Sequence, residues 1–317
     1  MRRRPDLVAV AFLLAPCSTA AADTAYVTCQ NGEEVAVIDL DTGETRATWS
    51  MPGNPAGIAI GRNGAEVYVV SPEGKTVRRL DAMTGDMLAS VTLDGGPTGI
   101  AADLSRGRIF VSDWFASRVW VLDAVSLEPT AELPVGASPA GLALSDSGRF
   151  LASADKDSDQ VSIFDAESLD PVGTVAVGVR PYGLRFAPDG RLFVANVGTN
   201  DVSVIDPQSR KVTDTFPVGE RPYGIAFAKD RIFVTNQYGN SLSVVSVDNL
   251  SPVDEIDTGE YPEGIDTTSD GSSVALVNWF DNTLMVVDAS TLTVSATYDT
   301  CDGPRAFGTF LTAGDKR

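Results

Sequence analysis

The sequence predicts an all-β fold, a seven-bladed β-propeller with four antiparallel strands in each blade. Two markers recur along the chain at the same interval. A proline returns every 40 to 42 residues, at Pro55, Pro97, Pro139, Pro181, Pro222, Pro262 and Pro304. An acid that closes an apolar run keeps this interval, at Asp39, Asp81, Asp123, Asp165, Asp206 and Asp288, with Ser246 in the sixth position. A period near 40 with four short apolar runs per unit is typical of a propeller blade.

The unit over residues 222–258 illustrates the four strands. A short apolar run, 222–227, follows a turn, and a β-rich run occupies 231–236. Polar and apolar residues alternate over 241–245, as expected for a half-buried strand. A more polar run over 253–257 ends the unit. We expect the most apolar strand to be innermost and the most polar strand to lie at the rim.

A glycine follows two places after most of these prolines, at Gly57, Gly99, Gly141, Gly183, Gly224 and Gly264. Inner strands crowd the axis of the ring, and glycine permits a close approach of two backbones. The last unit departs from this pattern with Ala306.

The two ends of the chain are expected to share one blade. The first unit begins at its second strand, 26–28, so we expect residues 305–310 to supply the missing strand, which removes an open sheet edge. Antiparallel pairing of these strands would place Cys29 beside Cys301, and we predict a disulfide between them. In the chain-entropy account so long a loop is worth about 5 kcal/mol. The alternative is a pair of buried free thiols.

Composition excludes several classes of function. The chain has 317 residues, a formal charge of −19 and no histidine, and its isoelectric point is near 4.3. Such an acidic protein repels nucleic acid and anionic lipid, so we expect neither nucleic-acid binding nor membrane insertion. Without histidine, a Ser-His-Asp triad, a His-ligated zinc and an axial His to haem are impossible.

The N-terminus resembles an export signal. Three arginines, Arg2 to Arg4, precede the apolar run 7–14, and Ala20 to Ala22 offer a small-residue cleavage pattern. We predict a signal peptide over residues 1–22, a single propeller domain over 23–317, and a periplasmic location. A lipoprotein cleavage site ending at Cys17 is the alternative, which Pro16 disfavours.

Short motifs connect the repeat to a known family. Tyr26-Val27-Thr28, the run Phe233-Val234-Thr235-Asn236 and the segment 202–206 resemble the YVTN-type β-propeller repeat. This resemblance covers the whole mature chain. It implies a binding platform, a surface-layer protein, a subunit of a quinone-dependent dehydrogenase or, occasionally, a lyase.

One face of the propeller is predicted to carry the functional site. The loops around the prolines share this face with the loops between the second and third strands. Its first three blades carry small residues, whereas the later blades carry cations and aromatic rings. The predicted ligand- or partner-binding set is Arg180, Tyr182, Asn196, Arg221, Tyr223, Gln237, Tyr238, Glu263, Trp279, Phe280 and Arg305. Such a set suits an anionic or aromatic ligand, or a partner loop. Alternatively, each Arg pairs with a neighbouring acid and each Tyr packs on the next strand.

Two acidic patterns favour structural roles. Asp155 to Asp159 has the spacing of a calcium loop, but Gln160 stands at the sixth position and Ala166 at the twelfth, so a solvated acidic turn is favoured. The recurrent closing acids, such as Asp123 and Asp206, are expected to cap turns through backbone N–H groups.

We therefore predict an exported, non-catalytic propeller, expected to be a monomer without a metal or cofactor, that binds a protein partner or a small anionic or aromatic ligand. The alternative is a subunit or accessory factor of a periplasmic quinone-dependent system for alcohol or amine oxidation. There, Glu263 with Tyr182 or Tyr223 would do acid–base work, and Arg180 or Arg221 would stabilise an anion. A surface-layer component is a third hypothesis.

Overall fold

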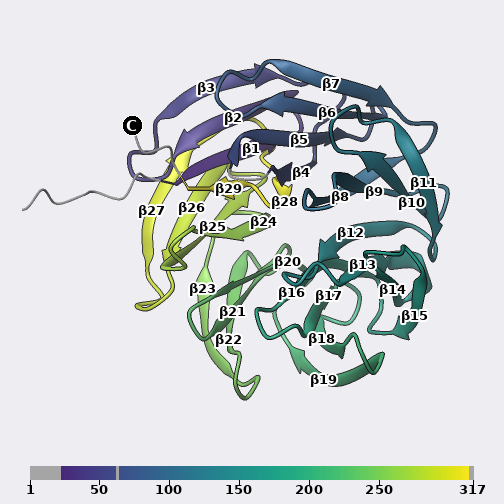
Figure 1. Ribbon diagram of the computed structural model, residues 1–317. Helices are drawn as coiled ribbons and strands as arrows, with labels where there is room; N and C mark the ends of the chain where they lie inside the picture. Colours follow the sequence, from purple (N-terminus) through teal and green to yellow (C-terminus); the bar gives the residue numbers. More distant parts are fainter. Residues whose placement is uncertain (1–22, 62–63, 314–317) are drawn as a thin grey trace, which may run out of the picture.

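Seven β-sheets are arranged in a ring around a central axis (Figure 1). The computed structural model describes residues 23–61 and 64–313 of the chain. The predicted signal peptide, 1–22, lies outside the described residues. No helix in the described part of the chain is both long and apolar enough to cross a membrane.

Each sheet is one blade, and the strands follow one another outward from the axis. The first blade contains β1 (Thr24–Cys29), β2 (Glu34–Asp39), β3 (Thr45–Ser50) and β29 (Leu311–Thr312). The second contains β4 (Gly57–Ile60), β5 (Glu66–Ser71), β6 (Thr76–Asp81), β7 (Met87–Thr92) and β28 (Phe307–Gly308). The third contains β8 (Pro97–Asp103), β9 (Arg108–Asp113), β10 (Arg118–Asp123) and β11 (Pro129–Pro134). The fourth contains β12 (Pro139–Leu144), β13 (Phe150–Asp155), β14 (Gln160–Asp165) and β15 (Pro171–Ala176), with a 3₁₀ turn, η2 (Lys156–Ser158).

The last three blades keep the same order. The fifth contains β16 (Pro181–Phe186), β17 (Leu192–Asn196), β18 (Asp201–Asp206) and β19 (Lys211–Pro217). The sixth contains β20 (Pro222–Ala228), β21 (Arg231–Asn236), β22 (Ser241–Ser246) and β23 (Pro252–Asp257). The seventh contains β24 (Pro262–Thr267), β25 (Ser273–Asn278), β26 (Thr283–Asp288) and β27 (Val294–Asp299). The prediction of seven blades with four antiparallel strands each is confirmed, and the second blade carries β28 as an additional, parallel strand beside β4.

The recurrent acids cap the turn after the third strand of their blades, as predicted. The Asp81 carboxylate accepts hydrogen bonds from the backbone N–H groups of Met83 and Thr84, both at 2.9 Å. Asp288 does the same for Ser290 and Thr291, at 2.9 and 2.7 Å. Each acid thereby fixes the tight turn that starts the outermost strand.

Adjacent inner strands approach closely enough to require the recurrent glycines. A Cβ added at Gly224 would lie 2.8 Å from the backbone oxygen of Glu263 in the next blade. One added at Gly141 would lie 2.6 Å from the backbone oxygen of Tyr182. Atoms cannot pack at such distances without displacing the strand, so the glycines set the spacing of the blades.

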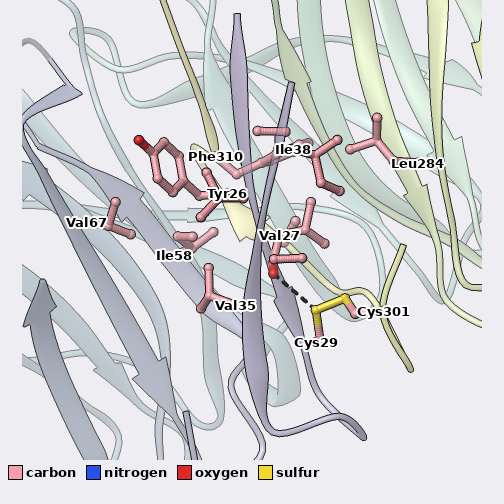
Figure 2. Packing of buried hydrophobic residues seen from close by; sticks show 14 of the residues in the cluster. Tyr26, Val27, Cys29, Val35, Ile38, Ile58, Val67, Leu284, Cys301 and Phe310 are labelled. Carbon is pink, nitrogen blue, oxygen red and sulfur yellow. Dashed lines mark hydrogen bonds between the residues drawn. A yellow bond between two sulfur atoms is a disulfide. The ribbon is translucent and has the colours of Figure 1, made fainter. Parts of the chain in front are cut away.

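Longer side chains fasten each blade to the next at the other end of the strands. The Tyr68 hydroxyl donates to the Ala124 carbonyl at 3.0 Å, and Arg231 Nη1 donates to the Ala289 carbonyl at 3.1 Å. Apolar side chains fill the space between the sheets. Figure 2 shows the cluster that packs the first blade against the second and the last blades.

The C-terminal segment completes the first blade, but it pairs through two short strands and one isolated bridge instead of the single strand predicted. Residues 311–312 in β29 pair with Thr24 and Ala25 of β1, and Pro304 forms an isolated bridge with Cys29. Between these points β28 turns aside and pairs in parallel with β4 of the second blade. The prediction of one strand over 305–310 is therefore wrong in its bounds. The physical reason is that the segment pairs with both the first and the second blade, so no single strand runs through it.

The predicted disulfide joins Cys29, at the end of β1 in the first blade, to Cys301, which follows β27 of the last blade. Their Cα atoms are 5.7 Å apart (Figure 2). Both cysteines are buried against the first-blade core. Free thiols, the alternative considered from the sequence, are not what the structure shows.

Candidate functional site

A cavity of about 540 Å³ opens on the face that carries the proline loops, between the sixth and seventh blades. It is lined by Gln237, Tyr238, Asn240, Glu260, Tyr261, Glu263, Trp279, Phe280 and Arg305. Six of these belong to the set predicted from the sequence, namely Gln237, Tyr238, Glu263, Trp279, Phe280 and Arg305. We call this space the blade 6–7 cavity.

Backbone hydrogen bonds between two loops shape its rim. The N–H of Trp279 donates to the carbonyl of Tyr261 at 3.0 Å, and the N–H of Phe280 donates to Glu260 at 3.3 Å. The Asp281 carboxylate accepts from the Glu260 N–H at 2.7 Å. Tyr261 adopts a left-handed backbone with φ of 62°, and its N–H donates to the Asn240 side chain at 3.0 Å. The loop before β24 is thus held to the loop after β25 and to the sixth blade.

Four aromatic rings form the wall of the cavity. The ring of Tyr261 lies 5.6 Å from Tyr238, 5.9 Å from Trp279 and 5.2 Å from Phe280, measured between centroids. Trp279 and Phe280 meet edge to face at 4.6 Å. Tyr238 and Phe280 remain 49% and 59% exposed. The Trp279 indole N–H is buried without a hydrogen-bond partner. The wall therefore offers ring faces to the cavity.

The floor of the cavity is charged. Arg305 lies in the C-terminal segment 304–312, which we call the closing segment. Its Nε is 3.0 Å from Oε2 of Glu263 on β24. Gln237 donates to Oε1 of the same carboxylate at 2.8 Å. Arg305 also donates to the Tyr223 hydroxyl, at 3.2 Å from Nη2, and to Gln30 at 2.9 Å. A cation from the chain end and an acid from the seventh blade thus meet beneath the aromatic wall.

Burial shifts the protonation of this floor. It raises the pKa of the Glu263 carboxyl to about 7, although the charge of Arg305 and the hydrogen bond from Gln237 act to lower it. Burial also raises the pKa of Tyr223 well above its ordinary value. Burial lowers the pKa of Arg305, but the charge of Glu263 together with Tyr223 and Tyr182 outweighs burial and raises that pKa well above the ordinary value. Glu263 is therefore the member of the floor that titrates near neutrality.

The other predicted site residues lie outside the cavity lining. Tyr182 and Tyr223 pack together at 4.6 Å and contact Phe307, so they fill the axis of the ring beside the floor. Arg221 stacks over the Tyr238 ring, with its Cζ 4.0 Å from the ring centroid, so it covers one face of that ring. Arg180 is exposed on the fifth blade.

Asn196 is fully buried at the end of β17. Its amide donates to the Asp201 carboxylate at 2.6 Å and to the Ser203 hydroxyl at 2.9 Å. These bonds hold the loop after β17, so the structure gives Asn196 a supporting position rather than a surface one.

Three lining residues were not in the predicted set, namely Asn240, Glu260 and Tyr261. Tyr261 had a visible signal, because it stands directly before Pro262, in the same slot as Arg180 and Arg221. Asn240 and Glu260 lie in turns whose sequence resembles the other blades, and nothing in the sequence distinguishes them.

Asp155, which has calcium-loop spacing, is buried at the end of β13. Its carboxylate accepts from Ser162 at 2.6 Å, from Gly136 at 2.9 Å and from Gln160 at 3.1 Å. The carboxylate thus ties β14 to the loop before β12. The favoured solvated turn is wrong for Asp155 itself, because the side chain points into the blade.

Comparison with known proteins supports the fold. The chain is similar to a solved structure described as dihydro-heme d1 dehydrogenase NirN in complex with DHE, with a TM-score of 0.67. The two share 15% sequence identity over 95% of this chain and 78% of that chain. At this identity the likeness is evidence for the β-propeller fold alone. No family model matches the chain, and no curated protein matches it.

Proposed function

We propose that this protein is a non-catalytic binding platform whose blade 6–7 cavity takes a small, planar aromatic ligand that carries a negative charge. One observation carries the proposal: a single cavity combines four aromatic rings with the Arg305 guanidinium. Its volume lies within the range of small-molecule sites.

The arrangement of charge favours an anion over a cation. An aromatic wall alone would also suit an organic cation. However, Arg221 already covers one face of Tyr238, and Arg305 lies in the floor. Guanidinium groups at these two places disfavour a further cation, and they attract a carboxylate or sulfonate even in a chain with formal charge −19.

We further propose that residues 23–317 form one exported domain of the YVTN type, with residues 1–22 as its signal peptide and the periplasm as its location. The Cys29–Cys301 disulfide supports export, because such bonds persist in oxidising compartments. The neighbour described as a dehydrogenase in complex with DHE is consistent with a propeller that holds a small ligand. It does not indicate which ligand this chain binds.

Glu263 favours one second candidate function, a subunit or accessory factor of quinone-dependent oxidation. A buried acid with a pKa of about 7 beside a tyrosine and an arginine is suited to general acid–base work. A quinone chromophore in the visible spectrum of protein purified from its native source would support this candidate over the first.

The binding proposal is tested with 8-anilinonaphthalene-1-sulfonate, a fluorescent aromatic anion. We expect saturable binding to the purified protein, weakened at least tenfold by Trp279→Ala or Phe280→Ala. Phe115→Ala is the matched control, because Phe115 occupies the same position as Phe280 on the third blade and is 81% exposed. Equal binding by Phe280→Ala and Phe115→Ala would overturn the proposal.

A further inference from the structure

Arg305 is the one cation that lines the blade 6–7 cavity among the described residues, and it already has a partner. Its Nε lies 3.0 Å from Glu263 Oε2, yet that oxygen has no well-directed hydrogen bond. The other oxygen, Oε1, accepts from Gln237. The two charged groups are therefore in contact, but Oε2 of Glu263, the oxygen nearest Arg305, accepts no hydrogen bond.

An anion that enters the cavity competes with the Glu263 carboxylate for the Arg305 guanidinium. The Glu263 side chain is only 3% exposed, so two negative charges around one guanidinium would repel each other with little screening by solvent. The repulsion disappears if one carboxylate is protonated. A ligand sulfonate stays ionised across the accessible pH range, so the proton must go to Glu263.

The groups around Glu263 leave it as the titrating member of the cavity. Burial raises the pKa values of Tyr223 and Tyr261 above their ordinary value, so both stay neutral near pH 7. Glu260 is the other acid that lines the cavity, Arg221 stacks on Tyr238 outside the lining, and the chain contains no histidine. The pKa of Glu263, about 7, lies in the accessible range.

We propose that an aromatic anion entering the cavity replaces Glu263 as the ion partner of Arg305, and that Glu263 takes up one proton from solvent as the anion binds. This inference rests on the proposed function and adds the way in which the site is regulated. Binding would then be favoured by mild acidity. Above the pKa of Glu263, affinity should fall by about tenfold for each pH unit, the slope for uptake of one proton.

The experiment measures binding of 8-anilinonaphthalene-1-sulfonate between pH 6 and pH 8.5 at constant ionic strength. Calorimetry at pH 8 in phosphate and in Tris, whose ionisation enthalpies differ, counts the protons taken up. We expect close to one proton per ligand and at least a tenfold loss of affinity from pH 6 to pH 8.5. The neutral probe N-phenyl-1-naphthylamine should show no such dependence.

Variants assign the proton to its residue. Glu263→Gln should bind the sulfonate with an affinity that no longer varies with pH. Glu220→Gln, an exposed acid on the same face outside the cavity lining, should keep the wild-type slope. If Glu263→Gln fails to fold, the calorimetric proton count on the wild-type protein still decides.

The outcomes separate the two proposals. Sulfonate binding that Phe280→Ala weakens, without proton uptake, would overturn this inference and leave the proposed function standing. Sulfonate binding that Phe280→Ala does not weaken would remove the proposed function, and this inference with it.

Discussion

The third and seventh blades carry the same dipeptide at the same position, with different results. Trp114-Phe115 follows β9, and Trp279-Phe280 follows β25. On the third blade Phe115 is 81% exposed, and Trp114 reaches away to Tyr182, at 6.3 Å. On the seventh blade both rings pack against Tyr261 and line a cavity.

The difference comes from the slot before the proline. Tyr261 occupies it on the seventh blade, and Gly96 occupies it on the third. A Cβ at Gly96 would collide with the Phe115 ring, so Phe115 lies over bare backbone. An aromatic pair on a propeller face thus becomes a pocket wall only where the facing loop supplies a third ring.

The largest expected effect concerns the charged floor, which the third blade lacks. Arg305→Ala leaves the Glu263 carboxylate buried without a cation. We expect a loss of about 3 kcal/mol in the free energy of unfolding at pH 8, and a smaller loss at pH 5, where Glu263 is protonated. Urea denaturation at both pH values measures it. Exposed Arg180→Ala is the control, and equal stability of the two variants at pH 8 would count against a coupled floor.

The next effect is the pH dependence of stability. The folded pKa of Glu263, about 7, is above the ordinary glutamate value of 4.5. Its contribution is therefore fully present below pH 4.5 and is lost as pH rises through 7. Between these limits the wild-type free energy of unfolding should fall by about 3 kcal/mol relative to Glu263→Gln. Asp155, whose pKa burial also raises, is common to both proteins and cancels. Parallel profiles would show that Glu263 titrates normally.

A smaller effect is expected when the seventh blade is made like the third. Tyr261→Gly removes the ring that contacts Tyr238, Trp279 and Phe280. The lost ring contacts are partly offset by relief of the left-handed backbone, worth about 1 kcal/mol. We expect about tenfold weaker binding of 8-anilinonaphthalene-1-sulfonate, or ~1.4 kcal/mol, with a modest change in melting temperature. Unaltered affinity would mean that the third ring is dispensable.

The smallest effect should come from the third blade itself. Phe115→Ala removes an exposed ring, so the stability should change by less than about 0.5 kcal/mol. Phe280→Ala removes ring contacts with Tyr261 and Trp279 and should cost about 1 kcal/mol. Paired thermal denaturation compares them, and a larger cost for Phe115→Ala would reverse our ranking of the two blades.

The repeat made the fold predictable because its marker residues do the same work in most blades. Asp81 and Asp288 cap equivalent turns, and Gly141 and Gly224 stand against equivalent carbonyls. The face of the candidate site followed from the same template. The burial of Asn196 did not, because its partners Asp201 and Ser203 are polar and the pattern fits an exposed loop equally well.

The charged floor was only partly predictable. Glu263 and Arg305 each follow a proline, so the sequence placed both on one face. Their pairing depends on the closing segment lying across two blades, which no local pattern records. The raised pKa of Glu263 results from its burial in the folded chain, which the composition does not indicate.

The closing segment also sets an order of assembly. Residues 304–312 leave the ribosome, and any export channel, long after β1. Until they arrive, β1 has a bare edge with free N–H and C=O groups, the kind of edge on which chains stick to one another. Nascent molecules are therefore most prone to aggregate just before these residues emerge, and removing Leu311 and Thr312 should leave the β1 edge bare permanently.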